Sequence, residues 1–148
     1  MRNEQKTTIT TPIPSGTSDS AILSTLHNHE AMINVMPAIE EQHKVSGDAS
    51  SSATYSITDR KPLPVGRQTW DYTITNQPDG VDTIVNASPP LGKLIITTKW
   101  RLVDGALKND VVVQGNRVMT GGVKDSVNKN HKEWQEKLLQ MAAQHSKN

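Results

Sequence analysis

The sequence predicts an α+β fold in which a curved antiparallel sheet of about six to seven strands holds one long C-terminal helix. Residues 120–146 carry apolar side chains at helical spacing, and most of the chain before them alternates apolar and polar residues in short runs. A helix of about seven turns with one apolar side needs a surface to pack on. The alternating runs, which are typical of strands, supply that surface.

The long helix is predicted from five apolar residues that recur every three, four or seven positions. They are Val123, Val127, Trp134, Leu138 and Met141. Lysine, glutamate and glutamine fill most of the positions between them, as expected for the solvent side of a helix. The Gly121-Gly122 pair indicates where the helix begins.

One strand and two short helices precede the main run of strands. Residues 6–13 are rich in β-branched side chains and predict a strand, which Pro12 restricts to an edge or a strand end. Ser18 or Asp19 can cap a first helix, and Asn28 can end that helix and cap a second one. Pro37 closes the second helix.

Six further strands are predicted before the long helix. They cover residues 39–45, 54–60, 68–76, 81–87, 93–103 and 108–119. The serine-rich stretch 46–53 is expected to be a flexible loop, Pro78-Asp79-Gly80 predicts a tight hairpin, and Gly115 indicates a bulge. The strands from residue 68 onward should form an antiparallel meander.

Composition narrows the function class. The 148 residues include 16 Lys plus Arg and 15 Asp plus Glu with no basic stripe, which argues against a nucleic-acid partner. The absence of cysteine excludes disulfides and thiolate metal sites. No stretch approaches the roughly 18 apolar residues of a membrane span and the N-terminus lacks an apolar signal region, so a soluble, cytoplasmic protein is expected. Phosphate-binding, dinucleotide and zinc motifs are absent, and no cofactor or metal is expected.

Four segments resemble a family of small fungal START-like proteins that is catalogued as a domain of unknown function. They are TTITTPIP at 7–14, AILSTLHNHEAMINVMP at 21–37, YSITDR at 55–60 and RVMTGGVKDSVNKNHKE at 117–133. The resemblance covers nearly the whole chain, and Leu-His-x-His-Glu-x-Met-Ile at 26–33 is its most specific part. It implies the helix-grip fold of the START or Bet v 1-like (SRPBCC) superfamily. The chain departs from the family by its short loop at 46–53 and by lacking a long insertion between Val103 and Lys108.

This resemblance implies a single ligand-binding domain over residues 1–148, with a cavity between the sheet and the long helix. Relatives in the wider superfamily bind lipids, sterols or polyketides, and some are cofactor-free cyclases, dehydratases or isomerases. One hypothesis is therefore a cofactor-independent cyclase or pericyclase of the Diels–Alder type. It would fold an apolar polyene, polyketide or terpenoid substrate in fungal natural-product biosynthesis. The other hypothesis is a non-catalytic carrier or sensor of a hydrophobic small molecule. Both leave room for a homodimer through an edge strand.

Tyr72 is the candidate catalytic residue. The strand at 68–76 places Trp70 and Tyr72 on one face, and on a concave face the phenol can donate to a substrate carbonyl in an apolar chamber. Trp100 on its strand and Trp134 on the long helix would add flat walls. The alternative is that these rings fill the core and that the Tyr72 hydroxyl is bonded to a neighbour.

Four polar residues complete the candidate binding set. Thr98 shares a strand face with Trp100, and Asn130 and His131 fall near the apolar stripe of the helix. His27, at the break between the short helices, is a candidate donor at the cavity mouth. The alternatives are that His27 caps this break and that His131 is a half-exposed surface histidine.

Two further interpretations of the polar residues are weaker. His27 and His29 do not share a helix face, so joint zinc ligation is not expected. An acid–base dehydratase would need His27 or His131 beside Asp59, and nothing in the sequence places them together. Lys99 and Arg101 alternate with Trp100 along the same strand, so their side chains point to the other face. We expect them on a solvated outer face, with Asp110 across from them.

Overall fold

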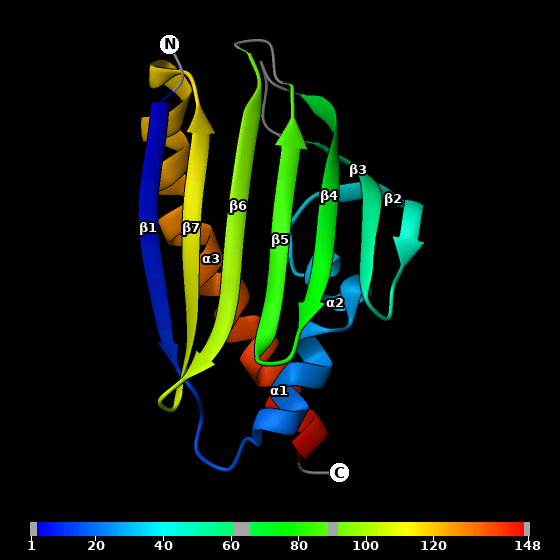
Figure 1. The fold of residues 1–148 in the computed structure, drawn as a ribbon, viewed down its shortest axis with the longest axis vertical. Coiled ribbons are helices and arrows are strands. Elements are labelled where there is room, and N and C mark those ends of the chain that lie inside the picture. The colour runs from blue at the N-terminus through cyan, green and yellow to red at the C-terminus, as the bar shows by residue number, and fades with distance from the viewer. Residues whose placement is uncertain (1–2, 61–65, 89–91, 147–148) are drawn as a thin grey trace.

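The computed structural model describes residues 3–60, 66–88 and 92–146, and it confirms the predicted α+β helix-grip arrangement (Figure 1). One seven-stranded antiparallel sheet has the strand order β1-β7-β6-β5-β4-β3-β2. The strands are β1 (Asn3–Pro12), β2 (Ile39–Asp48), β3 (Ser52–Arg60), β4 (Arg67–Gln77), β5 (Gly80–Ala87), β6 (Leu94–Val103) and β7 (Ala106–Gly115). The helices are α1 (Asp19–Leu26), α2 (His29–Asn34) and α3 (Arg117–Ser146).

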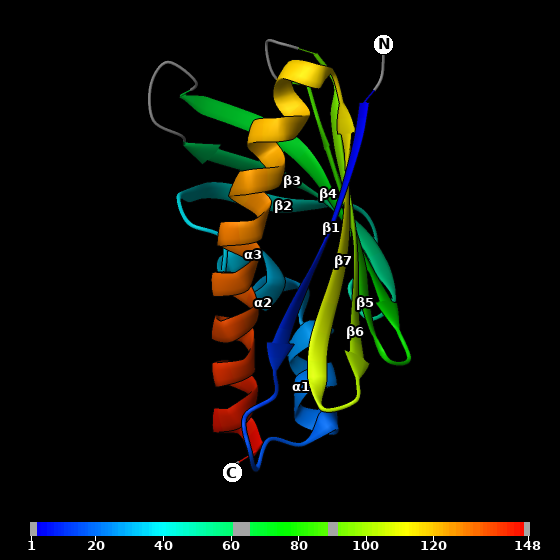
Figure 2. The same ribbon diagram turned by 90° about the vertical axis from the view of Figure 1, so that its left-hand side faces the viewer.

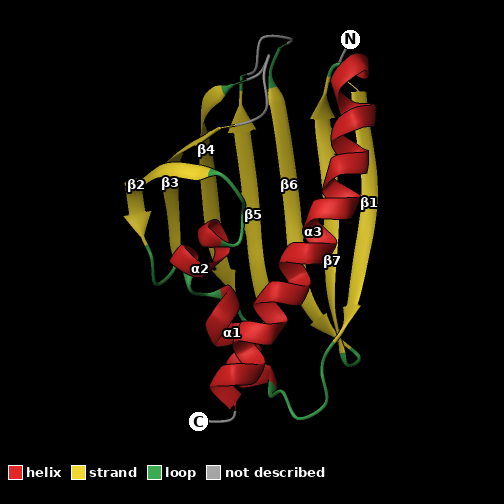
Figure 3. Cartoon of the chain, turned by 180° about the vertical axis from the view of Figure 1, so that it is seen from behind, coloured by secondary structure: helices red, strands yellow, loops and turns green. Residues whose placement is uncertain are grey.

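All three helices lie on one face of the sheet (Figures 2 and 3). The long helix α3 runs over β1 and β7 and reaches α1 near its C-terminal end. The short helix α2 lies beside the β3–β5 part of the same face, across from α3. The concave face is therefore flanked by α3 on one side and by α2 on the other.

The two short helices begin at the expected caps. The Ser18 side chain accepts a hydrogen bond from the Ala21 amide, and the Asn28 side chain accepts one from the Ala31 amide, each at 3.1 Å. Each cap satisfies a backbone donor that the first helical turn leaves unpaired. Because Asn28 caps α2 directly after α1 ends, the chain turns there without a long loop.

The meander from β4 to β7 is confirmed, and its turns set the register. The two-residue turn Pro78-Asp79 places Ile74 opposite Thr83 and Tyr72 opposite Val85. Gly80 has to be a glycine because a Cβ atom there would overlap the carbonyl oxygen of Trp100 on β6. Tyr72, Thr83 and Trp100 therefore all lie on the concave face.

The predicted loop at 46–53 is wrong, because most of it is strand. β2 continues to Asp48 and β3 begins at Ser52, and the tight turn between them is held by Asp48, whose side chain accepts from the Ser50 amide. β2 is exposed along almost its whole length and has register shifts next to Glu41 and Ser46. Serine and glycine are tolerated because pairing with β3 supplies the hydrogen bonds that their intrinsic propensity does not favour.

The predicted boundary between the last strand and the long helix is also wrong. β7 ends at Gly115 without a bulge in its described pairs, and α3 begins at Arg117, so Gly121-Gly122 lies inside the helix. The Thr120 amide donates to the Asn116 carbonyl oxygen at 3.1 Å, which closes the first turn. Two helical glycines cost about 2 kcal/mol, and a long helix packed on a sheet tolerates that loss.

The buried side of α3 differs from the predicted stripe. Val127 and Leu138 are buried as expected, whereas Val123, Trp134 and Met141 are only half-buried. The most buried row also contains His131, Gln135, Leu139 and Ala142. The helix is rolled toward β1 because Gln135 Nε2 donates to Thr11 Oγ1 at 3.0 Å and approaches the carbonyl oxygens of Ile9 and Leu107, both at 3.3 Å.

The rolled helix leaves one row of its residues half-buried next to the buried row. Successive residues turn by about 100° around a helix, so Asn130, Trp134 and Met141 share one side that is adjacent to the buried row. The buried core forms two clusters, one around α1, α2 and Trp100, and one of Ile9, Val111, Val113 and Val127.

The outer face of the sheet is polar, as expected. Lys99 lies opposite Asp110 in the β6–β7 register, and Arg101 forms ion pairs with Asp79 at 3.3 Å and Asp82 at 2.8 Å. Among the described residues, none of the helices combines the length and apolar character that a membrane crossing needs.

Candidate functional site

Three side chains form a buried hydrogen-bonded chain on the concave face, and Tyr72 lies beside it. Trp100 Nε1 donates to Thr98 Oγ1 at 2.7 Å, and Thr98 and Thr83 share a hydroxyl–hydroxyl bond. All four residues are at most 5% exposed. The register of β4, β5 and β6 brings them together, because Thr98 lies directly across from Thr83 and Tyr72 lies diagonally across from Thr83.

Burial keeps the Tyr72 phenol protonated. Loss of water raises the pKa of Tyr72 to about 12, although the hydrogen bond to Thr83 opposes the shift. The ring of Trp70, which is half-buried, stands edge-on to the Tyr72 ring with centroids 5.5 Å apart. At neutral pH, Tyr72 is therefore a hydrogen-bond donor next to a partly accessible aromatic surface.

A second part of the site stands on α3. The His131 ring lies between two indoles, with its centroid 5.9 Å from Trp100 in a stacked arrangement and 4.6 Å from Trp134. Burial lowers the pKa of His131 to about 4, so the imidazole is neutral at physiological pH. The predicted alternative of a half-exposed surface histidine is wrong, because His131 is 7% exposed.

Asn109 on β7 fixes the tautomer of His131. The Asn109 Nδ2 group lies 2.9 Å from His131 Nδ1. An amide nitrogen can only donate, so Nδ1 accepts and the ring proton is on Nε2. Within the described part of the chain, Asn109 Oδ1 is buried without a hydrogen-bond partner.

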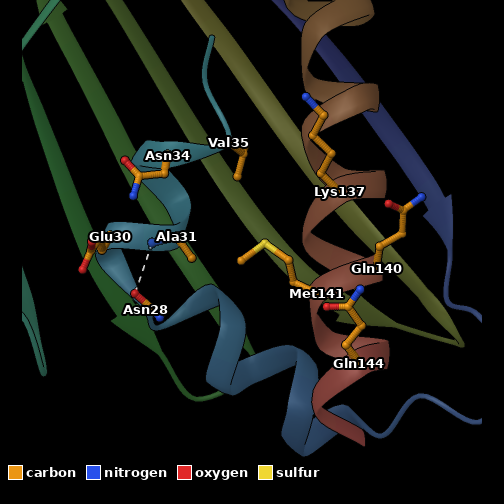
Figure 4. A pocket seen from close by; sticks show the side chains of 9 residues that line it. All are labelled: Asn28, Glu30, Ala31, Asn34, Val35, Lys137, Gln140, Met141 and Gln144. Atoms are coloured by element: carbon orange, nitrogen blue, oxygen red, sulfur yellow. Dashed lines mark hydrogen bonds between the residues drawn. The ribbon is translucent and has the colours of Figure 1, made fainter. Parts of the chain in front are cut away.

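An open cavity of about 540 Å³ lies between α2 and the C-terminal half of α3 (Figure 4). Its lining combines apolar side chains with amides and one charge of each sign. The residues are Asn28, Glu30, Ala31, Asn34, Val35, Lys137, Gln140, Met141 and Gln144. None of the sequence-predicted site residues lines this cavity. It borders the hydrogen-bonded chain only indirectly, because Val35 and Met141 pack against the core cluster that contains Tyr72 and Trp100.

The structure brings most of the predicted site residues together. Thr98 and Trp100 belong to the hydrogen-bonded chain, and Tyr72 lies beside it in contact with Trp70. His131 contacts Trp100 and Trp134. Asn130 is half-buried on α3, next to His131 in sequence. A role for these residues in binding or catalysis stays a prediction.

His27 is the predicted residue that lies apart from the others. Its Nε2 atom is 2.9 Å from the carbonyl oxygens of both Gln77 and Gly80, so the ring nitrogen donates to the β4–β5 turn. The dehydratase pairing with Asp59 has no support here. Asp59 lies across from Gln68, at the opposite end of β4 and roughly 30 Å from Gln77 at the usual rise per residue. No group of three or more possible metal ligands occurs among the described residues.

Sequence reasoning missed Thr83 and a cluster around His29. His29 Nδ1 lies 2.7 Å from the Tyr55 hydroxyl, and His29 Nε2 lies 2.9 Å from Asn76 Oδ1. Thr83 could have been found, because the Pro78-Asp79 turn fixes which parity of β5 faces the same way as Tyr72. The His29 cluster had no local signal, because its residues are 21 or more positions apart.

Residues 2–144 match the family model described as "Domain of unknown function (DUF7053)". The chain belongs to this family. No curated protein matches the sequence.

Solved structures share the fold at low sequence identity. Ara h 8.0201 is 15% identical with a TM-score of 0.60, and the match covers 99% of this chain and 98% of that one. The Zhui aromatase/cyclase from Streptomyces sp. R1128 is 11% identical with a TM-score of 0.62, covering 96% and 94%. The di-domain ARO/CYC BexL from the BE-7585A biosynthetic pathway is 11% identical with a TM-score of 0.64, covering 98% of this chain and 50% of that chain. These likenesses show the Bet v 1-like helix-grip fold of the DUF7053 chain.

Proposed function

We propose that this DUF7053 protein binds an apolar small molecule between α3 and the concave face of the sheet and promotes its ring closure without a cofactor. The carrying observation is the buried phenol of Tyr72 beside the bonded chain from Trp100 to Thr83, with the half-buried indoles of Trp70 and Trp134 on either side. Flat aromatic walls hold an apolar body, and one protonated phenol beside them polarises a carbonyl.

A Diels–Alder type closure fits the groups that are present. Such a reaction is an isomerisation in which two σ bonds form at the expense of two π bonds, and no atom is gained or lost. Restraint in a reactive fold lowers the barrier by several kcal/mol, and a single hydrogen bond to a carbonyl on the substrate adds about 1 to 3 kcal/mol. Neither effect requires a nucleophile or a charged side chain. Tyr72 is the donor in this proposal, and Trp70, Trp100 and Trp134 shape the site.

The comparisons support the proposal through the activities that two similar structures are named for. Two of the similar structures are named as aromatase/cyclases, and one of them belongs to a biosynthetic pathway. The same fold therefore carries ring-forming chemistry elsewhere, while the activity of this chain depends on its own residues. Fungal origin, a cytoplasmic location and a homodimer stay predictions of the sequence.

The decisive experiment is to incubate the protein with a metabolite extract of its source organism and to follow the extract by chromatography and mass spectrometry. The expected result is one compound replaced by an isomer of identical mass. Tyr72→Phe should lower the rate by about 10- to 100-fold, in proportion to one lost hydrogen bond in a dry site. Thr97→Val is the matched control, because Thr97 lies on β6 next to Thr98 but on the other face of the sheet.

The second candidate function is a carrier of a hydrophobic molecule. It is favoured by the open cavity between α2 and α3 and by the fact that burial keeps both Tyr72 and His131 uncharged. A carrier would release the same molecule that it took up. A bound compound recovered unchanged after incubation, with no isomer formed, would overturn the cyclase and leave the carrier.

A further inference from the structure

We propose that the cavity between α2 and α3 binds a small amphiphile whose carboxylate meets Lys137 and whose aliphatic part lies on Ala31, Val35 and Met141. None of these residues belongs to the region around Tyr72, where ring closure is proposed. Such a ligand is the cargo expected under the carrier function, on which this proposal rests, and ring closure is not required for it.

Both walls of the cavity are held in place by contacts within the protein. On one side, α2 is fixed to the sheet, because His29 Nδ1 lies 2.7 Å from the Tyr55 hydroxyl on β3. On the other side, α3 is held by the contacts of Gln135 with β1 and β7. The volume of about 540 Å³ falls within the roughly 300 to 1,000 Å³ of small-molecule sites. The cavity is therefore preformed, and a ligand does not have to separate two packed surfaces.

The middle of the cavity is apolar. Figure 4 shows Met141 reaching from α3 toward α2, and Val35 pointing into the gap at the end of α2. Ala31, one turn before Val35, is 8% exposed and lies on the same side of α2. Val35 and Met141 also pack against the hydrophobic core, so this apolar floor is continuous with the interior. An aliphatic chain placed here loses contact with water, and each fully buried methylene tightens binding by up to about 4-fold.

The two charged side chains of the lining are placed differently. Glu30 points away from α3, whereas Lys137 stands on α3 one turn before Met141 with its ammonium at the rim of the gap (Figure 4). Within the described part of the chain, Lys137 takes part in no ion pair or side-chain hydrogen bond. Gln140 and Gln144 can each donate or accept, so they do not select a charge. The cavity therefore offers one unpaired cation beside an apolar floor.

The amides on α2 add donors and few acceptors. Asn28 Oδ1 accepts from the Ala31 amide at 3.1 Å as the cap of α2, and Asn34 Oδ1 accepts from Gln42 Nε2 on β2 at 2.7 Å. The Nδ2 group of Asn28 is left, and it can only donate. Donors and a positive charge favour a ligand that accepts hydrogen bonds and is negatively charged. A carboxylate has both properties.

The test follows the methyl signal of Met141 by NMR, which is practical because the chain has only five methionines. Three probes with the same aliphatic chain, octanoate, octan-1-ol and octylammonium, are titrated at neutral pH, and the signal is assigned with Met141→Leu. Octanoate should bind about 4-fold more tightly than octan-1-ol, as expected for one charged contact at an exposed lysine. Octylammonium should bind more weakly than either.

Lys137→Gln should bring the ratio of the octan-1-ol and octanoate dissociation constants to about 1, because the carboxylate loses its cation. Lys132→Gln is the matched control, since Lys132 is exposed on the same helix and does not line the cavity. It changes the net charge equally and should leave the ratio at about 4. Because the readout is a ratio between probes, a general loosening of the fold does not imitate the result.

The apolar floor is tested with butanoate, which carries the same charge on a shorter chain. Octanoate should bind about 10-fold more tightly, because four more methylenes lie against a partly open apolar surface. Equal affinity of the two acids would show an ion at Lys137 without an apolar site and would overturn the proposal.

Two other results would also overturn it. One is an octanoate preference that is absent from the wild-type protein or survives in Lys137→Gln, and the other is tighter binding of octylammonium, which would assign the cavity to Glu30. If no probe shifts the Met141 signal, the carrier function fails together with this proposal. Formation of an isomer from an extract by the same protein would still uphold ring closure, so the two failures are distinguishable.

Discussion

Tyr55 and Tyr72 lie directly opposite each other on β3 and β4, on the same face and almost equally buried, yet their hydroxyls have different surroundings. Tyr55 meets His29 and, through it, Asn76. Tyr72 lies diagonally across from Thr83, which shares a hydroxyl–hydroxyl bond with Thr98 on β6. The first cluster joins β3 to α2 and to β4, whereas the second lies across β4, β5 and β6.

The clusters differ in how the tyrosine hydroxyl is held. The oxygen of Asn76 can only accept, so the His29 proton is on Nε2, and Nδ1 accepts from the Tyr55 hydroxyl. Each of these protons has an acceptor, so this balanced cluster anchors α2 to the sheet. Tyr72, in contrast, lies beside threonine hydroxyls that bond to each other. Buried tyrosines on one face of a sheet can thus differ in how firmly their hydroxyls are held.

The largest expected effect is on the balanced cluster. His29→Leu should lower the free energy of unfolding by about 3 kcal/mol, because it leaves the Tyr55 hydroxyl and the Asn76 oxygen without their partner. Urea denaturation measures this loss. His43→Leu, at an exposed position on β2, is the matched control and should change the stability by less than about 0.5 kcal/mol. An equal loss in both variants would contradict an anchoring role for His29.

Acid should weaken the protein through its buried histidines. The pKa of His131 is lowered from 6.5 to about 4 by burial, so the unfolded chain binds more protons than the folded one between these values. Stability should therefore fall as the pH is lowered from about 6.5 to about 4, by up to about 3 kcal/mol from this residue. Burial also lowers the pKa of His29, which adds to the loss in the same direction.

The share of each histidine can be separated by the slope of stability against pH, measured by denaturant titration. His131→Phe keeps a ring between Trp100 and Trp134 and removes the titration, so its slope should be markedly flatter than that of the wild type. A slope that is unchanged in His131→Phe would show that His131 does not titrate with a lowered pKa.

The two tyrosines give the most direct comparison. Tyr55→Phe should cost about 1 to 2 kcal/mol of stability, because His29 Nδ1 loses its donor. Tyr72→Phe should cost less than about 1 kcal/mol, because the Thr83 hydroxyl keeps its bond to Thr98. Thermal and urea unfolding of both variants measure the difference. A larger loss in Tyr72→Phe than in Tyr55→Phe would contradict the firmer anchoring of Tyr55.

The smallest expected effect concerns the backbone that follows α2. Ala38 has a positive φ of 64°, in the left-handed region that favours glycine. Ala38→Gly should raise the stability by about 0.5 to 1 kcal/mol, because relief of strain exceeds the entropy that glycine loses. Ala49→Gly is the control, since Ala49 does not have a positive φ and should become slightly less stable. If Ala38→Gly is also destabilised, the segment after α2 is not strained.

Much of the fold was predictable because it depends on local signals. Capping side chains at Ser18 and Asn28, the Pro78-Asp79-Gly80 turn and the alternation around Tyr72 each act within a few residues. The errors lie where pairing overrides local preference. Ser46–Asp48 joins β2 through bonds to β3, and Gly121-Gly122 is carried inside a helix of 30 residues. Neither the strand partner nor the length of the helix can be read from the glycines and serines themselves.

The sequence by itself determined the order of elements and the shared face of Trp70 and Tyr72. Periods of two and of about 3.6 residues are sufficient for that. Only the tertiary structure decided that α3 is rolled so that His131 and Gln135 are buried, that His27 contacts a turn away from the site, and that Tyr72 lies beside the bonded threonines of β5 and β6. The physical reason is that a hydrogen bond between residues distant in sequence depends on the register of the paired strands and on the angle at which a helix packs on the sheet. Each of those is set by the whole sheet.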